Sequence, residues 1–332
     1  MADCAFDVAG IGNAIVDVLA HADDAKLQAL GLEKGVMTLI DADRAEAIYA
    51  QMGPGIECSG GSAANSMAGV AALGGKAAYI GKVRADQLGQ VFRHDLKAQG
   101  VVFDTEAATD GAPTARCLIL VTPDAQRTMQ TYLGACVALG PDDIDPLIVA
   151  NAQVTYLEGY LWDPPQAKAA FLDAARIAHD AGRKVALSLS DPFCVGRHRE
   201  EFLELLSHHV DILFANEAEI TALYQCDFDS AVRQVRAHCD IAALTRGAKG
   251  SLVVEGGHVW VQGAETVTQV VDTTGAGDLY AAGFLYGLTQ GRSLGVCARL
   301  GGLCAAEIIS HVGARPEANL AELVAQTTLL TV

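Results

Sequence analysis

Short, almost continuously apolar runs rich in Val, Ile and Leu alternate along this chain with longer stretches in which apolar residues recur at helical spacing. The runs predict strands at residues 6–12, 77–83, 154–158, 184–188, 210–215 and 241–245. The longer stretches predict helices, among them residues 166–181, 231–238 and 293–310. Because apolar strands separated by helices are typical of a mainly parallel sheet covered on both faces, we expect an α/β fold.

Two segments, residues 14–41 and 105–133, break this rhythm with short extended runs around polar turns. In the second segment two strand-like arms flank Thr122, Pro123 and Asp124, which are residue types that favour a tight turn. The pattern predicts a β-hairpin there.

Composition narrows the class of protein. Of the 332 residues, 51% are hydrophobic and 19% charged, which is enough apolar material for a buried core. The formal net charge is −17 and the sequence shows no cluster of Lys and Arg, so a nucleic-acid-binding surface is not expected. An anionic ligand would need a locally positive pocket, built from helix N-termini, a metal ion or a few basic residues.

The nine cysteines are scattered without a CxxC pair, and we expect them to be small buried side chains in a reducing compartment. Cys297 and Cys304 share one face of a predicted helix, where core packing is favoured over metal ligation. Acidic residues near the N-terminus and the lack of an 18-residue apolar run predict a cytoplasmic protein without a membrane partner.

The sequence VVDTTGAGDLYAAGFLYGL, residues 270–288, reads as a strand end, a glycine-rich turn and the start of a helix. The backbone amides of Gly275, Ala276 and Gly277 can converge on an anion where the unpaired amides of a helix N-terminus also point. Asp278 beside them is placed to take a proton from a hydroxyl that attacks a phosphate. The alternative is a tight turn in which Asp278 caps the helix.

A second stretch, GGSAANSMAGVAALGGKAAYIGKV at residues 60–83, repeats this order of glycine turn, small-residue helix and apolar strand. Together the two stretches resemble the ribokinase-like (PfkB) family of carbohydrate and nucleoside kinases. The resemblance extends to GIGNAIVD at 10–17, NEAE at 216–219 and TRGAKGS at 245–251, and so covers essentially the whole chain. It implies one ribokinase-like three-layer α/β/α domain over residues 1–332, with a small β-sheet lid from about 14–41 and 105–133. A lid suits a kinase because water in the site would hydrolyse ATP.

The resemblance assigns the chemistry to the glycine-rich turn. It implies that Asp278 is the general base and that the amides of residues 275–277 form the anion hole for the transferred phosphoryl group. Arg127 matches an arginine that lies over the phosphates, although it can also be read as a solvated hairpin-tip residue, and Arg116 is the competing candidate. Asp272 and Thr274 match ligands of a monovalent cation such as K⁺, and Asp272 can equally be a turn residue.

For the acceptor, the positions that match sugar-hydroxyl contacts are Asn13, Asp17, Gly60, Gly61 and Asn65. Carboxylate and amide groups suit vicinal hydroxyls because they accept and, for the amide, donate hydrogen bonds. Without the resemblance, Asn13 reads as a turn residue and Asp17 as a solvated charge.

A purine acceptor would also need an apolar wall for stacking. The resemblance places Tyr160, Leu161, Trp162 and Phe193 there. Ordinary core packing is the alternative use of these side chains.

For the nucleotide, Asn216 and Glu219 match an element that orders Mg²⁺ through water, although Asn-x-x-Glu also reads as a helix capping box. Positions that match the border of the ATP groove are Thr245, Gly247, Gly250, Gly302 and His311. The paired glycines 301–302 in mid-helix indicate close approach of either adenine or another helix, and His311 can simply complement the helix dipole.

Within the family the chain is most similar to adenosine kinases, which implies transfer of the γ-phosphate of ATP to the 5′ hydroxyl of adenosine with ATP and Mg²⁺. The alternatives are a sugar kinase acting on ribose, fructose or a related sugar, and a regulator that binds nucleotide or sugar without turnover. A dinucleotide-dependent dehydrogenase is disfavoured because GIGNAI lacks the third glycine of GxGxxG. The expected partners are the small-molecule acceptor and ATP, in a monomer or homodimer.

Overall fold

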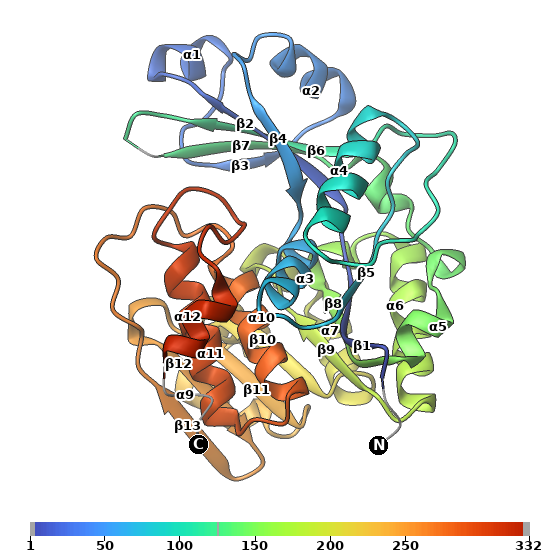
Figure 1. Cartoon of the computed structure of the whole chain (residues 1–332), viewed down its shortest axis with the longest axis vertical. Coiled ribbons are helices and arrows are strands. Elements are labelled where there is room, and N and C mark those ends of the chain that lie inside the picture. The colour runs from blue at the N-terminus through green and yellow to red at the C-terminus, as the bar shows by residue number, and fades with distance from the viewer. Residues whose placement is uncertain (1–3, 125, 328–332) are drawn as a thin grey trace.

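The computed structural model describes residues 4–124 and 126–327 and contains a larger and a smaller β-sheet (Figure 1). The larger sheet has the strand order β13-β12-β11-β10-β9-β8-β1-β5. Its strands are β1 (Phe6–Ile11), β5 (Ala77–Ile80), β8 (Ala152–Glu158), β9 (Lys184–Ser188), β10 (Ile212–Asn216), β11 (Ile241–Thr245), β12 (Ser251–Glu255) and β13 (His258–Gln262). Neighbours from β5 to β11 are parallel, and β12 and β13 are added antiparallel. The mainly parallel sheet and all six predicted strands are therefore confirmed.

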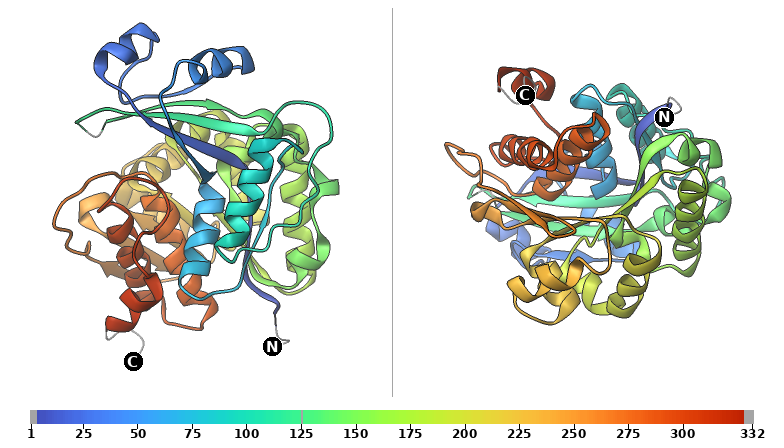
Figure 2. Two further views of the ribbon diagram at one scale, coloured as in Figure 1. Left: turned by 45° about the horizontal axis from the view of Figure 1, so that its top comes forward. Right: turned by 90° about the horizontal axis from the view of Figure 1, so that it is seen from below.

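Helices cover both faces of the larger sheet (Figure 2). On one face, side chains such as Val8, Tyr79 and Phe214 pack with the first group of helices, and on the other Ile11 and Leu187 pack with the second group. The first group is α3 (Ser62–Ala72), α4 (Gln87–Ala98), α10 (Ala276–Thr289), α11 (Leu294–Ile308) and α12 (Leu320–Gln326). The second group is α5 (Pro146–Ala150), α6 (Pro165–Asp180), α7 (Pro192–His208), α8 (Glu217–Tyr224) and α9 (Phe228–Val235). The predicted three-layer α/β/α arrangement is confirmed, and Cys297 and Cys304 lie in its core as expected.

The smaller sheet, called the lid sheet below, has the strand order β3-β7-β6-β2-β4. Its strands are β2 (Ile15–His21), β3 (Met37–Leu39), β4 (Ile56–Gly60), β6 (Ala115–Val121) and β7 (Arg127–Tyr132). The antiparallel pair β6–β7 is the predicted hairpin. The predicted lid segments contain four of these five strands, whereas β4 lies outside them because IECSG has no apolar run.

The two faces of the lid sheet have different neighbours. On the outer face, Val16, Val18 and Leu118 pack with residues of α1 (Asp24–Ala29) and α2 (Ala42–Tyr49). Because successive side chains of a strand point to opposite faces, Asp17 lies on the inner face. The same face carries an apolar cluster made by Cys117, Ile119, Val121, Ile15, Leu19 and Met129. Arg127 at the start of β7 forms an ion pair with Asp272, which lies just before α10. The inner face therefore lies toward the larger sheet.

The parallel strands of the larger sheet end at one edge, beneath the lid sheet (Figure 1). At β1 the strand order reverses, because β5 lies on one side of it and β8 on the other. Open α/β sheets bind ligands at the carboxyl ends of the strands at such a reversal. Residues that follow β1 and β8 are thereby brought together with the N-termini of α3 and α10.

Short 3₁₀ helices lie between these elements, at Gly134–Ala138, Pro141–Asp143, Gly159–Trp162 and Gly247–Lys249. The residues before α10 are not a strand, contrary to the strand end expected near residue 270; Val271 there donates a backbone hydrogen bond to Ile309 O at 2.8 Å.

Candidate active site

Asp278 joins the N-termini of two helices. Helix α10 is capped by Gly275, which has a φ of 77°, so Asp278 lies in the first turn rather than at the cap. Its carboxylate accepts hydrogen bonds from Ser62 Oγ at 2.6 Å and from Asn65 Nδ2 at 2.8 Å, both on α3. The capping alternative for Asp278 is therefore wrong, and its carboxylate is held by a second element in a fixed orientation.

The electrostatic setting of Asp278 makes it a stronger base than an exposed aspartate. Burial raises the pKa of its carboxyl, and the hydrogen bonds from Ser62 and Asn65 and the charge of Arg315 lower it only in part. A carboxylate with a raised pKa takes up a proton more readily, which suits a general base.

The predicted anion hole lies in the same turn. The amide of Ala276 is already engaged, since it donates to Thr273 O at 3.2 Å. A side chain added at Gly277 would meet open space, whereas one at Gly275 would meet Ala314 at 3.0 Å. Because the first amides of a helix have no acceptor within it and carry the positive end of its dipole, Gly275 and Gly277 remain the candidate donors.

Arg127 is a buried arginine with unused donors. Its Nη1 lies 3.0 Å from Asp272 Oδ2, and both side chains are 8% exposed. Within the described residues its Nε and Nη2 are buried without a hydrogen-bond partner. It is thus not a solvated hairpin-tip residue. The competing candidate, Arg116, lies on the outer face of the lid sheet, where it binds Glu46 at 2.5 Å and stacks over Tyr49.

Asp272 is fully engaged by its neighbours. Its Oδ1 accepts from Thr274 N at 3.0 Å and from Thr274 Oγ1 at 2.8 Å, which confirms the interpretation as a turn residue. Its Oδ2 accepts from Gly313 N at 3.1 Å and pairs with Arg127. Because a guanidinium already neutralises this carboxylate, Asp272 and Thr274 do not fit a monovalent cation. Residues 4–124 and 126–327 contain no group of three or more His, Cys, Asp or Glu that could hold a metal ion.

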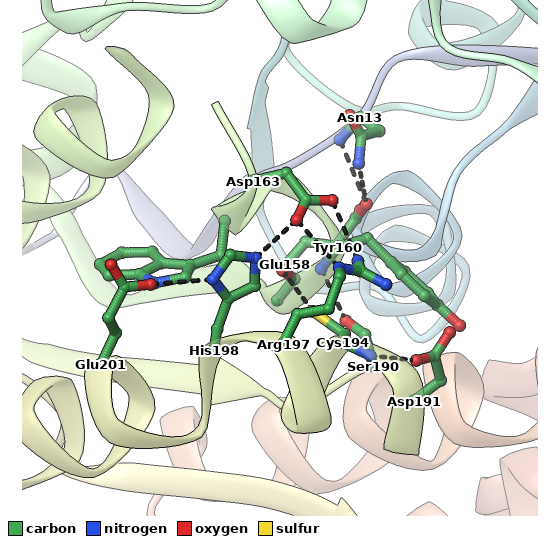
Figure 3. A network of polar contacts seen from close by, with 12 residues as sticks. Asn13, Glu158, Tyr160, Asp163, Ser190, Asp191, Cys194, Arg197, His198 and Glu201 are labelled. Carbon is green, nitrogen blue, oxygen red and sulfur yellow. Dashed lines mark hydrogen bonds and ion pairs between the residues drawn. The ribbon is translucent and has the colours of Figure 1, made fainter. Parts of the chain in front are cut away.

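Asn13 follows β1 and is 2% exposed. Its Nδ2 donates to Glu158 Oε1 at 2.8 Å (Figure 3), and its backbone N donates to the same oxygen at 3.3 Å. Asn13 Oδ1 is buried without a partner among the described residues. Gly61, with a φ of 90°, lies so close that a Cβ there would approach Asn13 O to 2.2 Å. The arrangement fixes the Asn13 amide and leaves one acceptor for a ligand hydroxyl.

Asp17 lies on the inner face of the lid sheet and is not a solvated charge. Burial raises its pKa to about 6; Arg315 and Arg127 lower it, and Asp278 raises it further. Gly60 packs against it, because a Cβ at Gly60 would lie 2.5 Å from Asp17 Oδ2. The charge of Asp278 therefore acts on Asp17 across the junction of the two sheets.

The predicted apolar wall is only partly present. Leu161 is 0% exposed and Trp162 is also buried, both within the core on the far side of the larger sheet, so the prediction of Leu161 as a substrate contact is wrong. The cause is the 3₁₀ helix Gly159–Trp162, which turns these side chains away from the strand end. Tyr160 and Phe193 are exposed at this edge, and Figure 3 shows Tyr160 next to Asp191.

Asn216 and Glu219 form the capping box at the start of α8. Glu219 N donates to Asn216 Oδ1 at 2.9 Å, and Asn216 N donates to Glu219 Oε2 at 2.9 Å. Burial raises the pKa of Glu219 to about 7, with the charges of Asp191 and Asp278 adding to the shift. Since each carboxylate oxygen can accept a second hydrogen bond, Glu219 fits a contact to a magnesium-bound water better than direct ligation.

The predicted strand, turn and strand are β11, a 3₁₀ turn and β12. Thr245 ends β11, Gly247 begins the turn and Gly250 directly precedes β12. Gly250 has a φ of 85°, and a Cβ there would lie 2.0 Å from Gln262 O. A glycine is therefore required at this turn.

The paired glycines of α11 serve two purposes. A Cβ at Gly301 would lie 2.7 Å from Tyr280 O of α10, so this glycine permits helix packing. At Gly302 the nearest atom would be Glu265 Cγ at 3.8 Å, which leaves that face open to the loop before α10. His311 beyond the helix lies 3.1 Å from Glu307 Oε1.

Three residues of the site were missed from the sequence: Ser62, Glu158 and Arg315. Ser62 had a local signal, since it lies within GGSAAN at the start of a predicted helix. Glu158 and Arg315 had none, because each meets its partners only through the fold. Glu158 Oε2 accepts from Ala63 N at 2.8 Å and caps α3 in place of a side chain at Gly61.

Within the described ranges, no helix is both long enough and apolar enough to cross a lipid bilayer.

Known proteins are similar to this chain in fold and sequence. Residues 44–320 match the model of the pfkB family of carbohydrate kinases. The crystal structure of adenosine kinase from Sinorhizobium meliloti is 56% identical, with a TM-score of 0.90 over 97% of this chain and 99% of that one. A crystal structure from Rhizobium etli CFN 42, described as a probable sugar kinase protein, is 53% identical, with a TM-score of 0.92 over 98% of this chain and 99% of that one. Adenosine kinase of Saccharomyces cerevisiae is 27% identical over 91% of this chain and 94% of its own length. This chain belongs to the PfkB family of carbohydrate kinases.

Proposed function

We propose that this protein transfers the γ-phosphate of ATP to the 5′ hydroxyl of adenosine. The observation that carries the proposal is the partly buried Asp278 carboxylate, held by Ser62 and Asn65 where the N-termini of α3 and α10 meet. A regulator that only binds its ligand has no use for a base beside a helix N-terminus. The similarity to the S. meliloti adenosine kinase favours adenosine as the acceptor.

The mechanism follows from the positions of these groups. Asp278 takes the proton of the 5′ hydroxyl, whose oxygen forms a bond to the γ-phosphorus while the bond from phosphorus to the β,γ-bridging oxygen breaks and ADP leaves. The amides of Gly275 and Gly277 donate to the phosphoryl oxygens, and the unpartnered Nε and Nη2 of Arg127 are further candidate donors to the same charge. Bound Mg²⁺ would neutralise phosphate charge, with Glu219 accepting from its water.

The inner face of the lid sheet supports a nucleoside acceptor. The partly exposed side chains Ile15, Leu19 and Met129 cover the buried cluster of Cys117, Ile119 and Val121 and form an apolar surface on the same face as Asp17. A purine base can pack against this surface while its ribose hydroxyls meet the Asp17 carboxylate and the unpaired Asn13 Oδ1. Tyr160 and Phe193 are the remaining candidates for the opposite wall.

A sugar kinase is the second candidate, because the R. etli protein of 53% identity is described as a probable sugar kinase. The two candidates are separated by measuring Mg²⁺- and ATP-dependent phosphorylation of adenosine, guanosine, cytidine, ribose and fructose. Burying roughly 100 Å² of base surface contributes about 2.5 kcal/mol, so kcat/KM for adenosine should exceed that for ribose by close to a hundredfold. Turnover of free sugars alone would keep the chemistry and overturn the acceptor.

Gly60 offers a test of the acceptor side. In Gly60→Ala the new methyl group occupies the place of the Asp17 carboxylate, which must move. We expect KM for adenosine to rise about tenfold, equivalent to about 1.4 kcal/mol of binding, with a smaller change in kcat. Steady-state kinetics check this, with Gly53→Ala as the control because a Cβ there meets no atom within 4 Å. An unchanged KM would place Asp17 outside the acceptor site.

A further inference from the structure

Arg315 is a partly buried arginine to which the sequence analysis assigned no role. It lies in the segment between α11 and α12. Its Nη1 donates to Asn65 Oδ1 at 2.6 Å, and its Nη2 donates to Ser59 O at 2.9 Å and to Ser59 Oγ at 2.8 Å. Ser59 in turn donates from N and Oγ to Asp95 Oδ2, at 2.7 and 2.6 Å. A continuous chain of contacts thus runs from α4 to the site.

These contacts span the junction of the two sheets. Ser59 belongs to β4 of the lid sheet and Asn65 to α3 of the larger unit, and only a short glycine-rich link separates them. In that link Gly61 has a φ of 90°. Arg315 therefore fastens the chain on both sides of the point where it passes from the lid sheet to the helix that holds Asp278.

Arg315 and Asp278 together fix which way the Asn65 amide faces. A guanidinium only donates hydrogen bonds, so the Asn65 atom next to it must be the acceptor Oδ1. Nδ2 is then left to donate to Asp278 Oδ2 at 2.8 Å. With Arg315 absent, the Asn65 amide is held only by its bond to Asp278 Oδ2 and is free to tilt away from its native position.

The charge of Arg315 acts on several groups. The titratable groups on which it acts include Asp17 on β2, Cys58 on β4, Tyr79 on β5, Asp95 on α4 and Asp278 on α10. Arg315 lowers the pKa values of Asp17 and Asp278 against the effect of burial. Arg127 acts on Asp17 in the same sense, whereas the charge of Asp278 raises the pKa of Asp17 and also of the two other buried carboxyls of the site, Glu158 and Glu219.

We infer that Arg315 is a positioning residue for phosphoryl transfer: it orients Asn65 toward Asp278 and fixes β4 to α3, so that the base is presented to the acceptor hydroxyl in one geometry. The part of this inference that concerns catalysis rests on the proposed function, in which Asp278 is the general base. The contacts themselves are independent of the acceptor's identity.

The experiment compares the native protein with Arg315→Met, Arg315→Lys, Asn65→Ala and the double variant Arg315→Met/Asn65→Ala. We expect Arg315→Met to lower kcat by up to about 10²-fold, as misplacement of a reacting group does. The acidic limb of its kcat/KM profile should move up by about one pH unit, because a nearby positive charge is lost. Arg315→Lys should keep the limb near its native position. If Arg315 acts through Asn65, the Arg315→Met change should have a smaller effect on kcat in the Asn65→Ala background.

Arg93→Met is the matched control. Arg93 is a partly buried arginine that donates to Phe103 O and Thr105 O, away from the site. Its loss should leave the pH profile unmoved. An Arg315→Met profile with the native acidic limb, or effects of Arg315→Met and Asn65→Ala that multiply independently, would overturn the inference. Arg315→Gln replaces Arg315→Met if the latter does not fold.

A second readout needs no substrate. Asp17 has a folded pKa raised to about 6, so it contributes stability at low pH that is lost as pH rises through 6. Removing Arg315 should raise the pKa of Asp17 further and so enlarge this loss of stability. The free energy of unfolding of Arg315→Met, measured by urea denaturation, should therefore fall further below that of the native protein at pH 8 than at pH 5. Equal deficits overturn the inference. If no acceptor is phosphorylated, the proposed function fails while this readout still decides the role of Arg315.

Discussion

Replacing Asp278 by asparagine is expected to reduce kcat for adenosine phosphorylation by about 10³-fold, within the range that a general base contributes. An asparagine fits the site without rearrangement: its Oδ1 can accept from Asn65 Nδ2, and its Nδ2 can donate to Ser62 Oγ, since a hydroxyl can also accept. The variant should therefore fold and bind adenosine. Stopped assays of kcat and calorimetric titration with adenosine measure the two effects separately.

The pH profile provides the check on mechanism. Because burial raises the pKa of Asp278, the native rate should fall with decreasing pH at values above those of an ordinary aspartate. Residual activity of Asp278→Asn should lack that limb, since no proton acceptor of raised pKa remains at this position. Ser62→Ala is the control, because it removes one contact to the carboxylate and keeps the base. This variant should retain the acidic limb of the pH profile and most of the native rate. Substantial turnover by Asp278→Asn would show that another group takes the proton.

Much of the fold could be predicted because parallel strands buried on both faces must be apolar throughout. That is why the runs at β1, β8, β9 and β11 were found at nearly their observed limits. Strand β4 was missed for the complementary reason: IECSG lies at the edge of the lid sheet, carries polar residues and owes its pairing to β2. Local pattern carries no information on such pairing.

The site divides in the same way. Asp278 and its glycine-rich turn were predictable because the peptide backbone at a helix N-terminus binds anions by local geometry. Leu161 was misplaced because a 3₁₀ helix after β8, rather than an extended strand end, decides where its side chain points. Arg315 gave no signal because its partners Ser59 and Asn65 are more than 200 residues away in sequence. Residues that act through tertiary contacts are visible only in the folded chain.

Glu158 is the residue whose loss should damage the fold most. It is 1% exposed and accepts from Asn13 N, Asn13 Nδ2 and Ala63 N, which lie on two different segments. In Glu158→Leu these donors are left buried without a partner, at a cost of about 1–3 kcal/mol each. We expect the free energy of unfolding to fall by about 3 kcal/mol, measured by urea denaturation, and KM for adenosine to rise because Asn13 loses its fixed orientation.

The pH dependence of this loss follows from the raised pKa of Glu158. Burial raises that pKa from 4.5 to about 7, so the native protein gains stability from Glu158 below pH 4.5 and loses it as pH rises through 7. Leucine does not titrate, and Asp17 and Glu219 titrate in both proteins, so the difference between native and variant should be larger at pH 5 than at pH 8. Glu255→Leu, at an exposed position on β12, is the control and should change stability by less than about 0.5 kcal/mol. A Glu158→Leu protein as stable as the native one, or a difference that grows with pH, would mean that the three amide donors find other acceptors and that Glu158 does not hold the start of α3.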